Sequence, residues 1–435
     1  MPKPHLKRTR RQLLSFNKWK LRLIFWSAAI VIGATAALFA LASSFSDGLF
    51  HRLYNYSPEL AYVVTPVGLA LIAWLTKHFF KGTEGSGIPQ AIAALSMRDS
   101  ALRATVLSIK IAIGKIFLTC MGLMCGASIG REGPTVHVGA SLMYSVRHYF
   151  PLRSQEMHRA LILAGGAAGI SAAFNTPLAG ILFAIEEMSR KFEERTSAVL
   201  IIAVVLAGVT AVSFLGDYTY FGSSSTHLPL TPYAWLAVIC YGIIGGLLGG
   251  LFSQILISGT RRIAPFVKRY PVSIAFSCGL LLSLLGMLSG GHTYGTGYDE
   301  ARHLVTGSGE VELGFPLFKM LATVVSYLSG IPGGIFAPSL SVGAGLGADL
   351  AMLFQGLPMQ ALVMIGMVSY FTGVVQTPIT AFVIVMEMTD SSSMLLPLMT
   401  AALIAKGMSH LVCPRPIYQA LADAYLARTS LKKDK

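Results

Sequence analysis

The sequence has 435 residues, of which 54% are hydrophobic and only 12% are charged, and its net charge is +14. This composition argues against soluble domains, because no polar stretch is long enough to fold as one and apolar runs approach the roughly 20 residues that cross a bilayer. Its basic residues stand near the ends and in short loops rather than in an aromatic-interleaved patch, so no nucleic-acid partner is expected. The five cysteines lie in apolar segments without metal-ligand spacing, so no metal or other cofactor is expected. We therefore predict an all-α polytopic membrane protein.

The two ends of the chain carry an excess of basic residues. Such residues tend to stay in the cytoplasm, so 1–22 is predicted to be a cytoplasmic N-terminus and the C-terminal tail is predicted to lie on the same side. The residues concerned are Lys3, Lys7, Arg8, Arg10, Arg11, Lys18, Lys20, Arg22, Arg428, Lys432, Lys433 and Lys435. A cleaved signal peptide is the alternative for the start, although the apolar run from Leu23 exceeds a usual h-region.

Apolar segments follow one another through 23–412, which we predict to be the transmembrane core. Several are too short, or too interrupted by glycine and proline, to cross a membrane alone. This pattern favours discontinuous helices packed closely inside the membrane. The segments lie near 23–45, 60–80, 104–127, 160–185, 198–215, 233–258, 272–290, 316–330, 340–355, 359–386 and 395–412.

Three motifs occur twice, in the same order. GSGIPQA at 85–91 is echoed by GTGYDEA at 295–301, GREGPTVHVGA at 130–140 by GIFAPSLSVGA at 334–344, and NTPLAGILFAIE at 175–186 by QTPITAFVIVME at 376–387. The offsets are 210, 204 and 201 positions. We interpret them as two homologous halves, about 60–200 and 270–410.

Repeated halves with broken helices are typical of transporters, whose substrate site lies between the repeats. A helix that begins inside the membrane exposes N–H groups and the positive end of its dipole, which attract anions. The candidate backbone donors are Ser86, Gly87, Ile335, Phe336 and Ala337, and the Ser86 hydroxyl can add another. The alternative is that glycine and proline in these motifs only permit tight packing.

Two acids are present in one half and absent from the other. Glu132 stands opposite Phe336, and Glu187 stands opposite Met388, whereas Glu186 is matched by Glu387 and is predicted to be architectural. An ionisable group inside a membrane segment is a functional hypothesis by default.

The two unmatched acids suggest proton chemistry. Burial disfavours a charged carboxylate and N–H donors favour it, so Glu132 is expected to exchange a proton. Its carboxylate could occupy an anion site, from which protonation would release it. Glu187 could pass a proton onward, or it could be a solvated acid at a helix end beside Arg190 and Lys191.

GSGIPQ, GREGPTVHVGA, GIFAPSL and the late PIYQAL with Tyr418 resemble, in order and spacing, the CLC family of chloride channels and chloride/proton antiporters. The resemblance covers essentially the whole chain. It implies a CLC-type fold of two inverted-topology repeats with broken, tilted helices, and a homodimer in which each subunit has its own anion path. It also implies a multi-pass protein of the cell (inner or plasma) membrane, with 413–435 forming a final pore-lining helix and a short basic cytoplasmic tail.

The resemblance also implies roles for individual residues. Ser86 and Tyr418 would donate hydroxyls to a central anion, and the backbone of Ile335 and Phe336 would complete that site. Glu132 resembles the family's external gating glutamate. The backbone positions that would line an outer anion site, for which its side chain competes, are Arg131, Glu132, Gly133, Phe336 and Ala337.

Glu187 matches the internal proton-transfer glutamate of antiporter members, and channels of the family usually carry an apolar residue there. The resemblance therefore favours an antiporter over a passive voltage- or pH-gated chloride channel. Lys115 matches the family's buried lysine. The serine of GSGIP favours chloride, with bromide or nitrate as other possible anions.

The sequence departs from the family pattern in two places. Only 17 residues follow Tyr418, so no paired CBS domains are expected after the core. Gln90, Ile92 and Ser96 stand where some antiporters place acids along the presumed inner proton entrance, which leaves that route open.

The stretch EEMSRK allows an alternative function, that of an intramembrane glutamic protease, because the paired carboxylates of an EExxxR motif activate water as general base in such enzymes. Here Lys191 occupies the arginine position, and the histidines near apolar segments show no obvious pairing. We therefore predict a transporter and not an enzyme.

Overall fold

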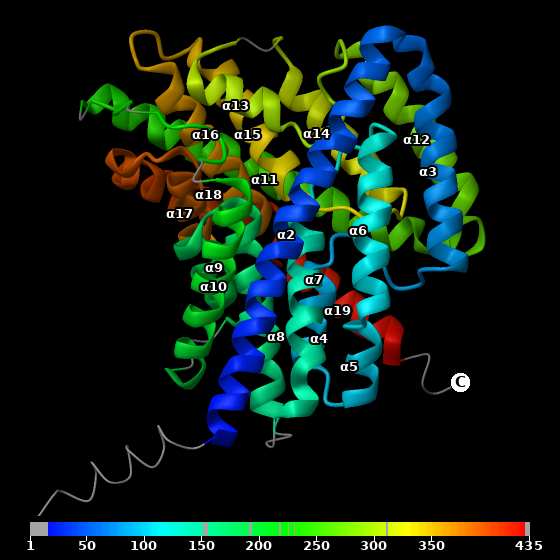
Figure 1. The fold of residues 1–435 in the computed structure, drawn as a ribbon. Coiled ribbons are helices and arrows are strands. Elements are labelled where there is room, and N and C mark those ends of the chain that lie inside the picture. The colour runs from blue at the N-terminus through cyan, green and yellow to red at the C-terminus, as the bar shows by residue number, and fades with distance from the viewer. Residues whose placement is uncertain are drawn as a thin grey trace, which may run out of the picture.

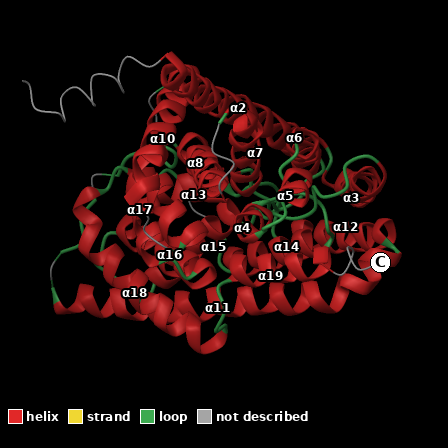
Figure 2. Ribbon diagram, turned by 90° about the horizontal axis from the view of Figure 1, so that it is seen from below, coloured by secondary structure: helices red, strands yellow, loops and turns green. Residues whose placement is uncertain are grey.

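The computed structural model describes residues 16–150, 155–190, 194–216, 219–224, 226–229, 231–309 and 312–430. The basic residues from Lys3 to Arg11, Lys191 and the lysines beyond 430 lie outside these ranges. Within the ranges every regular element is a helix, and only two isolated bridges pair backbone segments (Figure 2). Eight of these helices are long and apolar enough to cross a membrane. The predicted all-α polytopic fold is therefore confirmed.

The helices up to the middle of the chain belong mainly to the first repeat. Figure 1 shows α2 running from the lower to the upper end of the molecule, with α7 and α8 packed beside it. The elements are α2 (Phe16–Tyr56), η1 (Pro58–Leu60), α3 (Ala61–His78), α4 (Ile88–Ser96), α5 (Ser100–Val106), α6 (Ile109–Met124), α7 (Glu132–Ser145), η2 (Val146–Tyr149), α8 (Gln155–Phe174), α9 (Pro177–Phe183), the π-helix η3 (Ala184–Ser189) and α10 (Glu194–Leu215).

The later helices contain the second repeat. The long helix α11 runs along one side of the molecule (Figure 2) and packs against α16 and α18. The elements are α11 (Pro232–Arg269), α12 (Pro271–Leu288), α13 (Tyr298–Thr306), α14 (Phe315–Leu328), α15 (Phe336–Ala351), α16 (Met359–Val375), α17 (Pro378–Thr389), η4 (Ser392–Met394), α18 (Leu395–Val412) and α19 (Ile417–Ser430).

The apolar segments predicted at 160–185 and 359–386 are each broken into two helices. The first helix of each pair ends next to a residue in the left-handed conformation, Asn175 (φ 56°) or Gln376 (φ 60°). A left-handed residue stops a helix, and the Thr-Pro that follows starts a new one, because proline suits the first helical position. The same device therefore recurs in both halves, 201 positions apart.

The two halves meet at equivalent positions and run in opposite directions there. Gly130 N donates to Gly334 O, and Gly334 N donates to Gly130 O, both at 2.7 Å. The bridge is antiparallel, and the two glycines hold the same place in the repeated motif. The chain therefore runs in opposite directions through the equivalent motifs of the two halves, which agrees with the predicted inverted topology.

Small residues bring paired helices into backbone contact. An ideal Cβ on Gly139 of α7 would lie only 2.3 Å from Gly165 O of α8. In the second half, a Cβ on Gly366 of α16 would lie 2.5 Å from Gly343 O of α15. Helices this close depend on glycine, as is usual for packing inside membranes.

Glu186 and Glu387 cap helices across the two halves. Glu186 Oε2 accepts from Thr380 N at 2.7 Å, in the first turn of α17. Reciprocally, Glu387 Oε2 accepts from Ala179 N at 2.8 Å, in the first turn of α9. Each carboxylate thus satisfies N–H groups at a helix start and complements its dipole. Both glutamates therefore stabilise the fold, which is the role predicted for Glu186 because the second half has an equivalent acid.

Candidate functional site

The N-termini of α4, α7 and α15 meet inside the molecule. Both α4 and α15 pack against α7. Their N-cap residues Gly87, Arg131 and Ile335 make no side-chain capping bond. The first N–H groups of three helices are therefore directed into one buried region without caps from their own N-cap side chains, and the helix dipoles favour a negative charge there.

The chain approaches this region through backbone that only glycine adopts readily. Gly87 has a φ of 102°, and a Cβ there would lie 2.8 Å from the Cβ of His137 and 2.9 Å from Gly133 O. Gly133 in turn has no room for a side chain, because its Cβ would lie 2.2 Å from Ser86 Oγ. The glycines of GSGIP and GREGP therefore let α4 and α7 begin side by side.

Two buried hydroxyl groups in this region lack partners. Ser86, just before α4, and Tyr418, on α19, are each 1% exposed. Neither hydroxyl oxygen has a hydrogen-bond partner in the described part of the chain. A buried polar group left unpaired costs about 1–3 kcal/mol, so two of them beside helix N-termini indicate a place for a ligand.

Glu132 begins α7, is 0% exposed, and its carboxylate lies between the two halves. Oε1 accepts a hydrogen bond from the Tyr220 hydroxyl at 3.3 Å. The backbone N–H groups of Glu132 itself and of Ala337 face the carboxylate. Oε2 lies over Gly130, where a Cβ would be only 2.2 Å from it. The carboxylate therefore occupies a site that is lined by N–H groups from both α7 and α15.

The neighbouring Arg131 is directed away from the interior and held by α2. Its Nη1 donates to Ala40 O at 2.7 Å and to Ser43 Oγ at 3.1 Å. Its guanidinium also acts electrostatically on Glu132. Arg131 thus brings a positive charge near the site while its Nη1 is engaged with backbone and serine oxygens of α2.

Phe336, the repeat counterpart of Glu132, points into an aromatic cluster. Its ring centroid lies 4.3 Å from that of Phe371 and 5.1 Å from that of Phe174. The position that carries an acid in the first half therefore serves packing in the second, while the Phe336 backbone remains at the start of α15.

Glu187 lies in the π-helix η3 and is 1% exposed. Neither of its carboxylate oxygens has a close hydrogen-bond partner among the described residues, although the Thr377 side chain and the Arg190 charge lie near enough to favour its charged form. The alternative interpretation as a solvated helix-end acid is therefore wrong. Tyr418 interacts electrostatically with both Glu187 and Glu132.

The buried Lys115 has a counterpart that sequence analysis missed. Lys115 Nζ donates to Gly85 O at 3.0 Å. Lys319, 204 positions later, donates to Thr293 O, Tyr294 O and Gly295 O, each at 3.0 Å. The offset equals that of the GREGP motif, so the repeat itself held the signal that identifies Lys319.

Tyr220 was also missed, and no pattern in the sequence marks it. It lies between α10 and α11, outside every repeated motif.

The residues at the presumed inner proton entrance lie on α4: Gln90 Nε2 donates to Glu84 O at 2.6 Å, Ile92 is buried and Ser96 is exposed. Those three positions therefore carry no acid at the presumed inner entrance.

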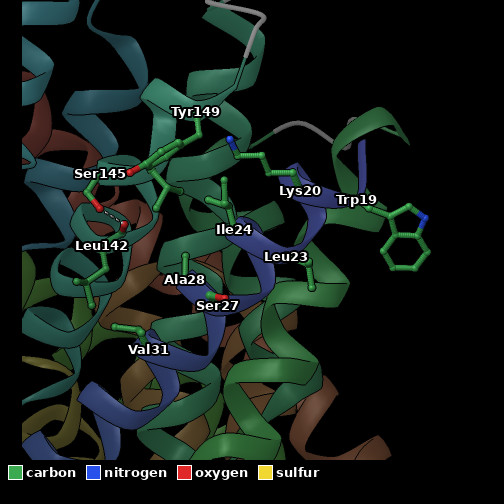
Figure 3. Close-up of a pocket in the computed structure, with 11 residues that line it drawn as sticks. Trp19, Lys20, Leu23, Ile24, Ser27, Ala28, Val31, Leu142, Ser145 and Tyr149 are labelled. Atoms are coloured by element: carbon green, nitrogen blue, oxygen red, sulfur yellow. Dashed lines mark hydrogen bonds between the residues drawn. The ribbon is translucent and has the colours of Figure 1, made fainter. Parts of the chain in front are cut away.

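A surface groove of about 520 Å³ lies elsewhere, between α2, α7 and η2 (Figure 3). Its lining is mainly apolar and includes Trp19, Leu23 and Leu142. It shares no residue with the region where α4, α7 and α15 meet, so it is not part of the buried site.

No cluster of three histidine, cysteine or acidic residues within the described ranges could hold a metal ion.

Comparison with known proteins gives consistent matches. The sequence profile of the voltage gated chloride channel family matches residues 68–410. The H(+)/Cl(-) exchange transporters ClcA of Salmonella agona and Citrobacter koseri are each 30% identical to this chain, over 98% of it and 92% of their own length. A slow cyanobacterial Cl-/H+ antiporter superposes with a TM-score of 0.78 at 25% identity, over 93% of this chain and 98% of its own. A CLC-type fluoride/proton antiporter superposes with a TM-score of 0.79 at 23% identity, over the same shares, and supports the fold.

Proposed function

The chain belongs to the voltage gated chloride channel family, and on that basis we propose that it is a secondary active transporter that exchanges chloride for protons. The observation that carries the proposal is the Glu132 carboxylate, which is buried among N–H groups of two helix ends. An anion and a carboxylate compete for such a site, and protonation removes the charge that holds the carboxylate there. Chloride movement is then coupled to proton movement at one residue.

The anion path has two positions in this proposal. In the central one, the hydroxyls of Ser86 and Tyr418, which have no partner within the described ranges, and the backbone N–H groups of Ile335 and Phe336 hold the anion. Gly87 lets the chain approach this position closely. The outer position is lined by backbone at Arg131, Glu132, Gly133, Phe336 and Ala337. Partial charges suit a transported anion, because a full charge in contact would hold it too tightly.

Glu187 supplies the inner proton step. It is buried without a close hydrogen-bond partner in the described part of the chain, and only the nearby Thr377 side chain and Arg190 charge offset its burial. A buried ionisable group in a membrane segment points to function. Tyr418 lies in electrostatic range of Glu187 and Glu132. The relatives are named exchange transporters, which supports antiport over a passive channel and over any enzyme.

The proposal is tested by flux measurements in proteoliposomes. A chloride gradient should drive protons uphill with the wild-type protein. Glu187→Val should abolish proton movement while anion movement persists, and Glu132→Ala should leave an ungated anion leak without protons. Asp423→Asn, which changes an exposed acid on the helix that carries Tyr418, is the matched control and should behave as wild type.

Chloride flux that moves no protons against their gradient over a broad pH range would identify a passive channel instead. Repeating the assay with bromide, nitrate and fluoride would establish the anion preference.

The proposal extends to location and assembly. We place the protein in the cell membrane with both termini in the cytoplasm, on the strength of the basic residues at each end. We also propose a homodimer, supported by the exposed apolar residues Ile201, Ile202, Val205 and Val209 on α10, which need a lipid or protein surface. The molecular mass of the detergent-solubilised particle tests the dimer.

A further inference from the structure

The described part of the connection between α10 and α11, at 219–224 and 226–229, is hydrogen-bonded to the second half of the molecule. Phe221 N donates to Met388 O at 3.0 Å, and Ser224 N donates to Thr389 O at 3.1 Å. These bonds attach the connection to the end of α17. Tyr220, which precedes the first of them, is 2% exposed. Its backbone is therefore held at a defined place beside the buried site.

The ring of Tyr220 is enclosed on several sides. Its centroid lies 5.2 Å from that of Phe174, 4.9 Å from that of Phe221 and 4.9 Å from that of Tyr298. The Arg131 guanidinium carbon lies 5.8 Å from the ring centroid, in the range of a cation–π contact. A ring packed in this way has one orientation, so the position of its hydroxyl is set before any ion arrives.

That hydroxyl donates to Glu132 Oε1 at 3.3 Å. The other carboxylate oxygen, Oε2, lies over Gly130 and has no hydrogen-bond partner among the described residues. We propose that Tyr220 is a positioning residue for Glu132, and that its hydroxyl holds the charged carboxylate in the outer anion position. This inference rests on the proposed role of Glu132.

The pH dependence of exchange is the readout of this bond. The other charged or titratable groups in electrostatic range of Glu132 are Arg131, which stays charged, and the buried phenol of Tyr418. A donor to the charged form of a carboxylate favours that form. Removing the donor should therefore let Glu132 take up a proton, and leave the outer anion position, at a higher pH.

The test is the pH profile of chloride/proton exchange by the full-length protein in liposomes. Tyr220→Phe keeps the ring and its packing but removes the hydroxyl. We expect the pH of half-maximal exchange to rise by about half to one unit, since the bond is long for an O–H donor and one unit corresponds to about 1.4 kcal/mol. At acid pH, where Glu132 is protonated in both proteins, the rates should converge.

Tyr298→Phe is the matched control. Tyr298 packs on the same ring, but its hydroxyl accepts from Arg302 Nη1 at 3.5 Å and makes no bond to Glu132. Its profile should overlie that of wild type. In a Glu132→Gln background, Tyr220→Phe should shift nothing, because the group that titrates is gone.

The outcomes separate this inference from the proposed function. If Glu132→Gln abolishes the pH dependence while Tyr220→Phe overlies wild type and Tyr298→Phe, the role of Tyr220 is wrong and that of Glu132 stands. If Glu132→Gln keeps the wild-type pH dependence, both are wrong. An equal shift in Tyr220→Phe and Tyr298→Phe would indicate a general effect of the aromatic cluster and would also overturn the inference.

Discussion

The N-termini of α4 and α13 occupy equivalent places in the two halves, but their polar groups are used differently. The Ser86 hydroxyl, before α4, is buried and has no partner among the described residues. The Thr296 hydroxyl, before α13, donates to Asp47 Oδ2 at 3.2 Å. In its first turn α4 has no acid, whereas α13 has Asp299 and Glu300. One helix end keeps its positive potential for a ligand, and the chain's own acids neutralise the other.

The buried lysines of the two halves, Lys115 and Lys319, also differ in how many groups of the chain they bind. Lys115 binds one carbonyl oxygen and has Glu84, an exposed residue, as its acidic neighbour. Lys319 binds three carbonyl oxygens and interacts electrostatically with both Glu300 and Asp47. Duplication thus supplied two similar frameworks. The first leaves the Ser86 hydroxyl without a partner among the described residues, and the second fills the equivalent place with a network of charged groups.

The largest effect should come from removing the lysine of the fixed network. Lys319→Met keeps most of the side-chain volume but leaves Asp47 and Glu300 without their buried cation, which should cost about 3–5 kcal/mol of stability. Lys115→Met removes one hydrogen bond and should cost only about 1–2 kcal/mol. Thermal unfolding of the detergent-solubilised protein, followed by intrinsic fluorescence, measures both.

A second substitution shows whether charge is the cause. Adding Glu300→Gln to Lys319→Met removes one of the two acids that lose the Lys319 charge and should restore part of the lost stability. Equal melting temperatures for Lys319→Met and Lys115→Met would break the comparison, since the two lysines would then be equivalent parts of the scaffold.

The three repeated motifs are enough to predict two homologous halves and to single out Glu132 and Glu187, whereas the inverted topology was implied by the family resemblance. They work because equivalent positions can be compared within one chain, so an acid that only one half keeps stands out. Lys319 was also predictable, from the offset it shares with GREGP. Tyr220 was not, because its place depends on backbone bonds to the end of α17 and on aromatic packing, which no local pattern encodes.

The cross-caps show another limit of sequence reasoning. The repeat predicts that Glu186 and Glu387 play equivalent roles, and the structure confirms it. Equivalence does not reveal that each acid reaches the helix start of the opposite half. Partners that lie in opposite halves become known only from the structure.

The caps offer a symmetric counterpart to the lysine experiment. Glu186→Gln and Glu387→Gln should each lower stability by about 1 kcal/mol, because each weakens bonds to a helix N-terminus. Glu186→Gln should cost somewhat more, since Glu186 Oε2 also accepts from Thr380 Oγ1 at 2.9 Å. Thermal unfolding again measures the change. A full effect in one variant and none in the other would contradict the reciprocal arrangement.

The smallest effect is expected at His292, a partly exposed residue in the loop before α13 that contacts Glu300 of the charged network around Lys319. His292 Nδ1 lies 3.6 Å from Glu300 Oε1, with the two side chains 45% and 12% exposed. The contact with the Glu300 carboxylate raises the pKa of His292 above its ordinary 6.5. Burial alone would raise the pKa of Glu300, but His292 and Lys319 bring it below its ordinary 4.5.

The signs of these two shifts define a pH window. The contribution of His292 is complete below pH 6.5 and is lost as the pH rises through its raised pKa. That of Glu300 is complete above pH 4.5 and is lost as the pH falls through its lowered pKa. His292→Asn should therefore reduce stability by less than about 1 kcal/mol near pH 5.5, because the histidine is partly exposed, and should have no effect at about pH 8.5. No such histidine–glutamate pair is described at α4 in the first half. If the melting temperature of His292→Asn equals that of wild type across this pH range, the His292–Glu300 pair does not contribute to the difference between the halves, and Lys319 accounts for it.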